Sequence, residues 1–245
     1  MPDYDEALYE KLKINIAMCR ESISDCLKLA GREPGSVTLI GVSKVFPVEY
    51  AEAAVACGLE DLGENRVQEL LPKVERFSAL DLKCNWHLIG TLQKNKVKYI
   101  IGKTSLIHSV NTLELAEEIS KRSLNNNVTT DILLQANVSG EESKHGFAPH
   151  ELKPALDKIG DLPNVRIRGL MTMAPIQTYE GEAREVFART REIFEDLSSY
   201  CKERQAWNVL SMGMSQDYRS AILEGATHVR IGTAIFGDRA KYLGT

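Results

Sequence analysis

Apolar residues recur at steps of three and four along the first thirty residues, which places them on one face of a helix. Gly31 follows the last of them and predicts the end of that helix. After it the period changes, because short apolar runs rich in β-branched residues alternate with longer stretches of helical spacing. The pattern therefore predicts an N-terminal helix followed by a series of strand–helix units.

Short apolar runs predict eight strands. They cover residues 37–44, 61–65, 86–90, 106–110, 131–138, 166–173, 208–213 and 228–235. Strands that alternate with helices form a parallel sheet with crossover connections. Eight such units in 245 residues fit a closed (β/α)8 barrel, the TIM barrel, whose usual length is ~250 residues. We expect one α/β domain over residues 1–245, with the N-terminal helix added to the barrel.

An open, doubly wound sheet is the structural alternative to a barrel. That fold usually carries a glycine-rich GxGxxG turn after its first strand. Here the first predicted strand runs directly into Ser43, Lys44, Val45 and Phe46. The sequence therefore favours the barrel.

Charge and composition narrow the classes of function. A net charge of −4 without a long basic run argues against nucleic-acid binding. A polar N-terminus and the lack of ~20 consecutive apolar residues argue against a signal peptide and a membrane span. The five cysteines form no CxxC pair and the five histidines are dispersed, which indicates a reducing compartment and no metal site. We expect a cytoplasmic protein without metal, membrane or nucleic-acid partners.

Lys44 is the first candidate for chemistry. In a TIM barrel the active site lies at the carboxyl ends of the strands, and Lys44 ends the apolar run VTLIGVSK. Desolvation would favour its neutral amine, which is a nucleophile toward an aldehyde. The ordinary alternative is a lysine that simply reaches solvent, which is the commoner case for a lysine at a strand end.

The loops after the seventh and eighth strands usually bind phosphate in these barrels. Ser211 opens the segment SMGMS, which leads to Ser215 and a helix, and Gly232 and Thr233 lie in the eighth apolar run. Small residues let backbone N–H groups approach a phosphate, and hydroxyls and a helix N-terminus add donors. Turn chemistry explains each residue alone, but their occurrence in both expected loops favours a phosphate site.

Arg230 lies inside the eighth predicted strand, where a buried charge must be paired or must face a ligand. One interpretation is an internal salt bridge, for instance with Glu64. The other is a donor to a ligand in the barrel mouth. A guanidinium does not give up its proton, so a pyridine nitrogen that faces an arginine stays unprotonated. The ring is then a weak electron sink.

Three further residues, Asn65, His87 and Met173, come at or near the ends of predicted strands and are candidates for the pocket wall. A satisfied core histidine and a space-filling methionine are the ordinary alternatives. Lys144 lies in the polar stretch GEESKH, where a solvated lysine is the preferred interpretation.

Several long motifs in the same order resemble those of the pyridoxal phosphate homeostasis proteins, the YggS or PROSC family. They are GVSKVFP, GENRVQE, WHLIGTLQKNK, SKHGF, GLMTMAP, LSMGMSQDY and VRIGTAIFG. The resemblance extends from the N-terminal helix to Gly237 and implies the barrel of the alanine racemase N-terminal domain, called fold type III among pyridoxal phosphate proteins. It thus implies pyridoxal 5′-phosphate as the cofactor.

The resemblance also implies roles for individual residues. Lys44 would form a Schiff base with the cofactor, and Arg230 would face its pyridine nitrogen. The remaining cofactor-binding positions are Ser215, Gly232 and Thr233 around the phosphate and, with less defined roles, Asn65, His87, Met173 and Ser211. Lys144 matches a lysine implicated in a secondary cofactor site or in cofactor transfer.

The expected function follows from a departure from alanine racemase, which has a second, β-rich domain that supplies a catalytic tyrosine to the partner subunit. This sequence lacks such a domain, and racemisation needs a base on each face of the substrate Cα. We therefore expect a monomer that buffers pyridoxal 5′-phosphate or delivers it to apoenzymes in vitamin B6 and amino-acid homeostasis, without efficient catalysis.

Two other functions stay open at this point. A pyridoxal-dependent racemase of low activity or narrow specificity needs a second acid or base near the open face of the ring, and Tyr218 and His87 are its candidates. A lysine-dependent aldolase acting on a sugar phosphate would use the same barrel, Schiff base and phosphate loops. The motif match ranks the aldolase last.

Overall fold

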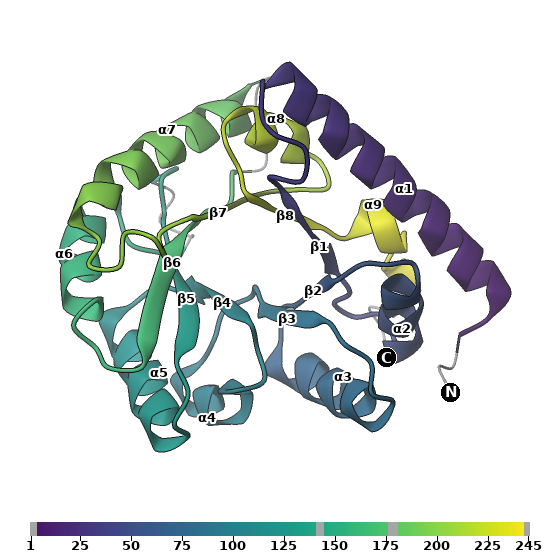
Figure 1. The fold of residues 1–245 in the computed structure, drawn as a ribbon, viewed down its shortest axis with the longest axis horizontal. Helices are drawn as coiled ribbons and strands as arrows, with labels where there is room; N and C mark the ends of the chain where they lie inside the picture. Colours follow the sequence, from purple (N-terminus) through teal and green to yellow (C-terminus); the bar gives the residue numbers. More distant parts are fainter. Residues whose placement is uncertain (1–3, 141–144, 176–180, 243–245) are drawn as a thin grey trace.

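The computed structural model describes residues 4–140, 145–175 and 181–242. Within them eight parallel strands close into a barrel in chain order (Figure 1). The strands are β1 Thr38–Val42, β2 Asp61–Glu64, β3 Asn85–Leu88, β4 Leu106–Val110, β5 Thr130–Gln135, β6 Val165–Met171, β7 Val209–Met214 and β8 His228–Ile231. Because β1 pairs with both β2 and β8, the sheet has no free edge. The predicted (β/α)8 architecture is confirmed.

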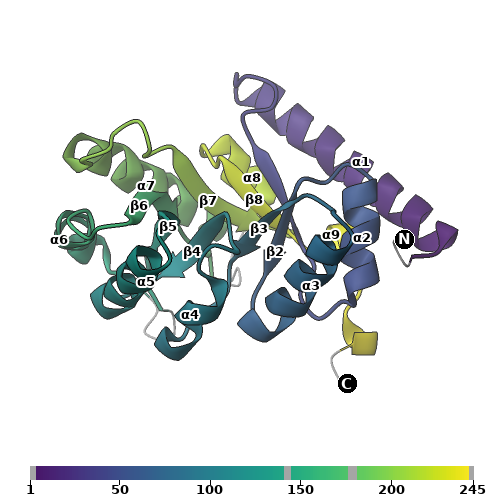
Figure 2. The same cartoon turned by 60° about the horizontal axis from the view of Figure 1, so that its bottom comes forward.

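Helices surround the barrel and cover the outer faces of its strands (Figures 1 and 2). They are α2 Val48–Ala56, α3 Val67–Ala79, α4 Val97–Ile100, α5 Leu113–Asn125, α6 Pro149–Ile159, α7 Glu182–Leu197, α8 Tyr218–Leu223 and α9 Thr233–Phe236. Short 3₁₀ turns occur at η1 Lys94–Lys96, η2 Ser198–Tyr200 and η3 Ala240–Tyr242. Local signals explain several of the starts: Thr112 caps α5 by accepting a hydrogen bond from the backbone N–H of Leu115 at 3.2 Å.

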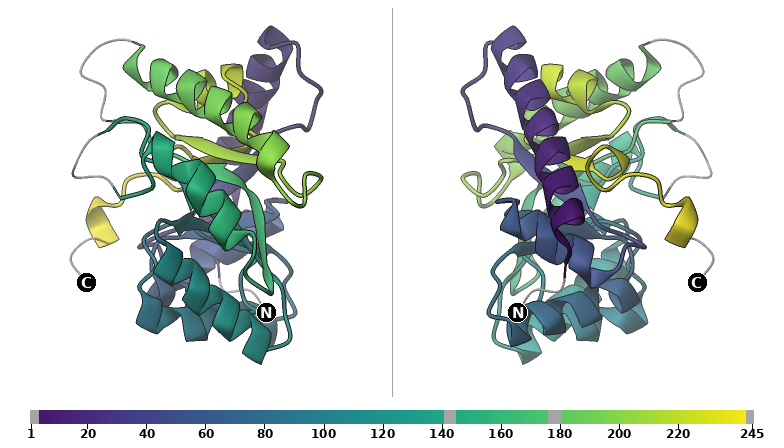
Figure 3. Two further views of the ribbon diagram at one scale, coloured as in Figure 1. Left: turned by 90° about the vertical axis from the view of Figure 1, so that its left-hand side faces the viewer. Right: turned by 90° about the vertical axis from the view of Figure 1, so that its right-hand side faces the viewer.

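The N-terminal helix, α1 (Glu6–Leu29), lies outside the barrel against α2, α8 and α9 (Figure 3). Asp5 caps it by accepting from the backbone N–H of Leu8 at 2.6 Å. Its buried face largely follows the predicted spacing and consists of Leu12, Ile16, Cys19, Ile23, Cys26 and Leu27. Asn15 Nδ2 also donates to the carbonyl of Ile235 at 2.7 Å, so α1 holds the last helical turn of the barrel in place. No helix in the described part of the chain is both long and apolar enough to cross a bilayer.

Most of the predicted strands end earlier in the structure than in the sequence pattern, and the ends of β8 and β1 bear on the site. β8 stops at Ile231, and residues 233–236 form α9 instead of continuing the strand. The carbonyl of Gly232 accepts from the N–H groups of Ile235 and Phe236 at 3.0 and 2.9 Å, which starts the helical turn. β1 likewise stops at Val42, so Lys44 lies in the turn after the strand and not in the strand itself.

Candidate functional site

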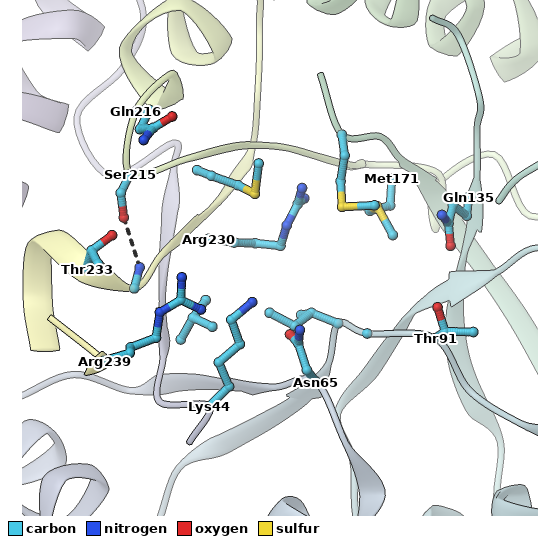
Figure 4. Close-up of a pocket in the computed structure, with 16 residues that line it drawn as sticks. Lys44, Asn65, Thr91, Gln135, Met171, Ser215, Gln216, Arg230, Thr233 and Arg239 are labelled. Carbon is cyan, nitrogen blue, oxygen red and sulfur yellow. Dashed lines mark hydrogen bonds between the residues drawn. The ribbon is translucent and has the colours of Figure 1, made fainter. Parts of the chain in front are cut away.

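A cavity of about 360 Å³ opens at the carboxyl ends of the strands (Figure 4). This is the end at which TIM barrels bind their ligands, and the volume suits a small molecule. Most of the residues predicted for the site line it: Lys44, Asn65, Met173, Ser215, Arg230, Gly232 and Thr233. The structure thus brings together residues at or just beyond the carboxyl ends of β1, β2, β6, β7 and β8 that are distant in sequence.

Lys44 extends its amine into this cavity (Figure 4). Its side chain is half-buried, and burial lowers the pKa of Lys44 below its ordinary value. The positive charge of Arg239 lowers the pKa of Lys44 further, whereas the carboxylates of Glu69 and Glu64 oppose the shift. The neutral, nucleophilic form is therefore more populated than in a lysine that faces water.

The residue before Lys44 is held by a buried ion pair between α3 and β2. Lys73 Nζ lies 2.6 Å from Glu64 Oε1 and donates to the carbonyl oxygen of Ser43 at 2.8 Å. The hydroxyl of Ser43 donates to the same Glu64 oxygen at 2.5 Å. Lys73 therefore has a structural role, and its ion pair with Glu64 fixes the backbone at the end of β1.

The residue after Lys44 is held from the same helix. The backbone N–H of Val45 donates to Glu69 Oε2 at 2.9 Å. Val45 has φ of +64°, a left-handed conformation that is strained for a β-branched residue. The turn therefore has a defined shape on both sides of Lys44, and this shape directs the lysine into the barrel mouth.

Ser215 and Thr233 lie together at one polar corner of the cavity (Figure 4), and Gly232 directly precedes Thr233 there. Ser215 Oγ accepts from the backbone N–H of Gly232 at 3.1 Å, which ties the loops after β7 and β8 together. A Cβ built on Gly232 would lie 3.4 Å from the carbonyl oxygen of Val42, an ordinary contact. The protein itself therefore does not require glycine there, and the missing side chain leaves room for a ligand.

Arg230 points from β8 into the centre of the cavity, although only 4% of it is exposed. Its Nη1 donates to Ser211 Oγ at 2.6 Å, and its Nη2 donates to the carbonyl oxygen of Thr172 at 2.9 Å. Burial lowers the pKa of Arg230 to about 10, with Asp217 opposing the shift, so the group stays charged at neutral pH. The alternative of a salt bridge with Glu64 is wrong, because Glu64 pairs with Lys73.

Two of the predicted site residues lie elsewhere. His87 does not line this cavity: it is buried between His108 and Asp61, with N···N and N···O distances of 2.9 Å, and it faces a cavity at the opposite end of the barrel. The ordinary interpretation of a satisfied core histidine therefore applies to His87. Ser211 is fully buried and contacts the site only through Arg230. Lys144 lies outside the described residues.

Sequence reasoning missed Arg239, a half-buried cation that lines the cavity beside Lys44 (Figure 4). It belongs to the segment after α9, and Tyr242 anchors that segment. The Tyr242 and Tyr50 hydroxyls are 2.9 Å apart, and the Tyr242 ring lies 5.1 Å from that of Phe46. Arg239 is visible in the sequence as part of FGDRAKY, but no periodicity in this segment indicates that the chain folds back over the barrel mouth.

Known proteins are similar to this chain over most of its length. The family model of the alanine racemase N-terminal domain matches residues 29–240. The pyridoxal phosphate homeostasis protein of Aquifex aeolicus is 46% identical over 226 residues, which cover 91% of this chain and 95% of the relative. The protein of the same name from Pseudomonas aeruginosa is 43% identical over 226 residues, covering 92% and 94%.

A solved structure is also similar. PipY of Synechococcus elongatus with PLP bound is 35% identical and superposes with a TM-score of 0.76. The match covers 88% of this chain and 100% of PipY.

Proposed function

This chain belongs to the family of pyridoxal phosphate homeostasis proteins, and we propose that it binds pyridoxal 5′-phosphate at the mouth of the barrel and acts as its carrier. One observation carries the proposal: a half-buried lysine amine shares one cavity with a hydroxyl-lined, glycine-containing corner and a buried arginine. The names of the relatives and the PLP-bound state of PipY support the same ligand.

The residues of the cavity fit the three parts of this cofactor. When bound, pyridoxal phosphate supplies an aldehyde that condenses with an amine and releases water. Lys44 would supply that amine, and its lowered pKa would favour the neutral, nucleophilic form near neutral pH. Ser215 and Thr233 offer hydroxyl donors suited to a phosphate, and Gly232, whose backbone N–H donates to Ser215 Oγ, leaves room for it beside them.

Arg230 is the residue suited to the pyridine nitrogen. Because its pKa of about 10 lies well above neutral pH, it donates hydrogen bonds and does not transfer a proton to the ring. A ring nitrogen that stays unprotonated withdraws electrons weakly. Arg230 therefore favours holding the cofactor over using it to stabilise carbanions.

The surroundings of Lys44 also favour a carrier over a racemase. Within the described residues, those that line the cavity include no Asp, Glu, His, Cys or Tyr that would serve as a second base. Tyr218, one candidate, directs its hydroxyl toward α1 and donates to Ser22 Oγ at 2.8 Å. His87, the other candidate, lies at the opposite end of the barrel. We propose a monomeric, cytoplasmic carrier that supplies pyridoxal-dependent apoenzymes.

Solvent exchange distinguishes a carrier from a racemase. We expect the protein loaded with pyridoxal phosphate to exchange the Cα proton of common L-amino acids for deuterium no faster than free pyridoxal phosphate does. The exchange is followed by proton NMR, with Lys44→Ala and the exposed Lys103→Ala as paired variants. Rapid exchange that disappears in Lys44→Ala but persists in Lys103→Ala would contradict the carrier role and support a racemase.

A further inference from the structure

A chain of buried hydrogen bonds runs through the barrel interior from Arg230 at the cavity to Asp61 at the opposite end. Arg230 Nη1 lies 2.6 Å from Ser211 Oγ, and Ser211 Oγ lies 2.9 Å from His108 Nδ1. His108 Nε2 lies 2.9 Å from His87 Nδ1, and His87 Nε2 lies 2.9 Å from Asp61 Oδ1. The chain thus connects β8, β7, β4, β3 and β2.

Four of the five side chains are almost inaccessible to water, and only Asp61 at the far end is partly exposed. Ser211 and His108 are 0% exposed, His87 is 3% exposed and Arg230 is 4% exposed. Barrel interiors of this fold are usually filled by branched apolar residues. A buried polar chain is costly unless every member is satisfied, so its presence here calls for a role that apolar packing would not provide.

The two ends of the chain fix the direction of every proton in it. Arg230 can only donate, so Ser211 Oγ accepts from it and turns its own hydroxyl hydrogen to His108 Nδ1. His108 then carries its proton on Nε2 and donates to His87 Nδ1. His87 carries its proton on Nε2 and donates to the carboxylate of Asp61, which can only accept. Each donor in this arrangement has one acceptor.

The charge states agree with that direction. Burial lowers the pKa of His108 well below its ordinary value, so its imidazole is neutral. Burial works against ionisation of Asp61, but the hydrogen bond from His87 outweighs it and holds the pKa of Asp61 below its ordinary value. Asp61 is therefore a carboxylate at neutral pH and remains an acceptor.

We propose that Ser211, His108, His87 and Asp61 are positioning residues that orient the Arg230 guanidinium toward the cofactor ring. This inference rests on the proposed function, because it assigns to Arg230 the ring nitrogen of pyridoxal phosphate. Ser211 and the Thr172 carbonyl hold Nη1 and Nη2, and both are neutral groups.

A carboxylate bonded directly to Arg230 would orient it as well, but would cancel most of its charge inside the cavity. The hydrogen-bond chain instead keeps the carboxylate of Asp61 at the far end of the barrel. Asp217 also acts on the charge of Arg230, but its Oδ1 accepts from the backbone N–H of Met214 at 2.6 Å. Arg230 therefore keeps both a fixed orientation and its positive charge at the ring.

The proton arrangement can be measured directly by nitrogen NMR on protein labelled with ¹⁵N-histidine, with and without pyridoxal phosphate. Two variants, His87→Gln and His108→Gln, assign the signals. We expect both rings to carry a proton on Nε2, as the hydrogen bonds require, and the His108 ring to be neutral at neutral pH. A proton on Nδ1 of either ring, or a doubly protonated ring, would contradict the proposed direction.

The positioning role is tested by the dissociation constant and the visible band of bound pyridoxal phosphate. We expect Ser211→Ala to raise the Kd about tenfold and to shift the band, because Arg230 and His108 each lose a partner. Ser211→Thr, which keeps the hydroxyl, restores both. At the far end, Asp61→Leu weakens binding of pyridoxal phosphate about threefold. Ser105→Ala, in the same far cavity but not part of the hydrogen-bond chain, leaves the affinity unchanged.

The outcomes separate this inference from the proposed function. If the wild-type protein binds pyridoxal phosphate and both Ser211→Ala and Asp61→Leu keep its Kd within twofold and its band unchanged, the positioning role is wrong. Asp61→Leu decides the matter if Ser211→Ala does not fold, because the side chain of Asp61 reaches the far mouth of the barrel. If the wild-type protein itself does not bind pyridoxal phosphate, the proposed function fails instead.

Discussion

Individual residues in the barrel mouth differ in how far the sequence reveals them. Lys44, Gly232 and Arg230 were predictable, because strand ends and the last two loops are where this fold places its ligands. His87 was not, although it lies near the end of β3. Its register partner on the neighbouring strand is Leu106, the first residue of β4, so the stagger of the barrel puts His87 in a lower layer. Sequence spacing does not contain that stagger.

Gly232→Ala adds one methyl group to the polar corner and tests whether that corner binds the phosphate. The backbone φ of −107° at Gly232 is open to alanine, so we expect the free energy of unfolding to change by less than about 0.5 kcal/mol. Affinity for pyridoxal phosphate should fall about tenfold, or ~1.4 kcal/mol, because the methyl occupies space next to the phosphate. Fluorescence titration measures the affinity, with the exposed Ala234→Ser as control. Unchanged affinity would remove Gly232 from the site.

Whole elements were predicted more accurately than their ends. The apolar run 228–235 contains β8 and most of α9, and periodicity does not separate a short buried strand from a buried helical turn.

The role of α3 beside Lys44 was also not predictable from the sequence. Its spacing predicts a helix, but nothing in the sequence shows that Lys73 and Glu69 clamp the residues on either side of Lys44. Those contacts depend on how the helix packs on the barrel.

Lys73→Met tests the clamp between α3 and β2. Removing the lysine leaves the Glu64 charge buried, and Glu64 Oε2 already has no hydrogen-bond partner in the described part of the chain. We expect a loss of about 3–5 kcal/mol in the free energy of unfolding, measured by urea denaturation. The double variant Glu64→Gln with Lys73→Met should recover most of this loss. Equal stability of Lys73→Met and wild type would show that the ion pair contributes little.

At the scale of the whole molecule, the closed barrel divides the polar interior into two ends. The carboxyl end holds Lys44, and the other end holds His228, His87 and Asp61. The closed barrel and the presence of an N-terminal helix followed from the sequence pattern. The return of the C-terminal segment, which brings Arg239 to Lys44, did not, because aromatic packing of Tyr242 against distant residues determines it.

The stability of the barrel should depend on pH through its buried histidines. Burial lowers the pKa of His228 to about 4, so the unfolded chain binds a proton at His228 over a range where the folded protein does not. Stability is therefore retained above pH ~6.5 and lost as the pH falls toward 4, by up to about 3 kcal/mol from His228. Thermal unfolding between pH 7 and 4.5 measures this. His228→Gln should flatten the dependence of stability on pH, and the exposed His150→Gln should not. A profile of His228→Gln identical to that of the wild type would contradict the role assigned to His228.

The central claim is that Lys44 holds pyridoxal phosphate covalently at the carboxyl end of the barrel. The most direct measurement is the visible spectrum of the purified protein with added pyridoxal phosphate, before and after borohydride reduction, followed by peptide mass mapping. We predict a yellow band that reduction abolishes, with the added mass on the peptide that contains Lys44. A protein that stays colourless, or a reduced adduct only on another lysine, would contradict the account.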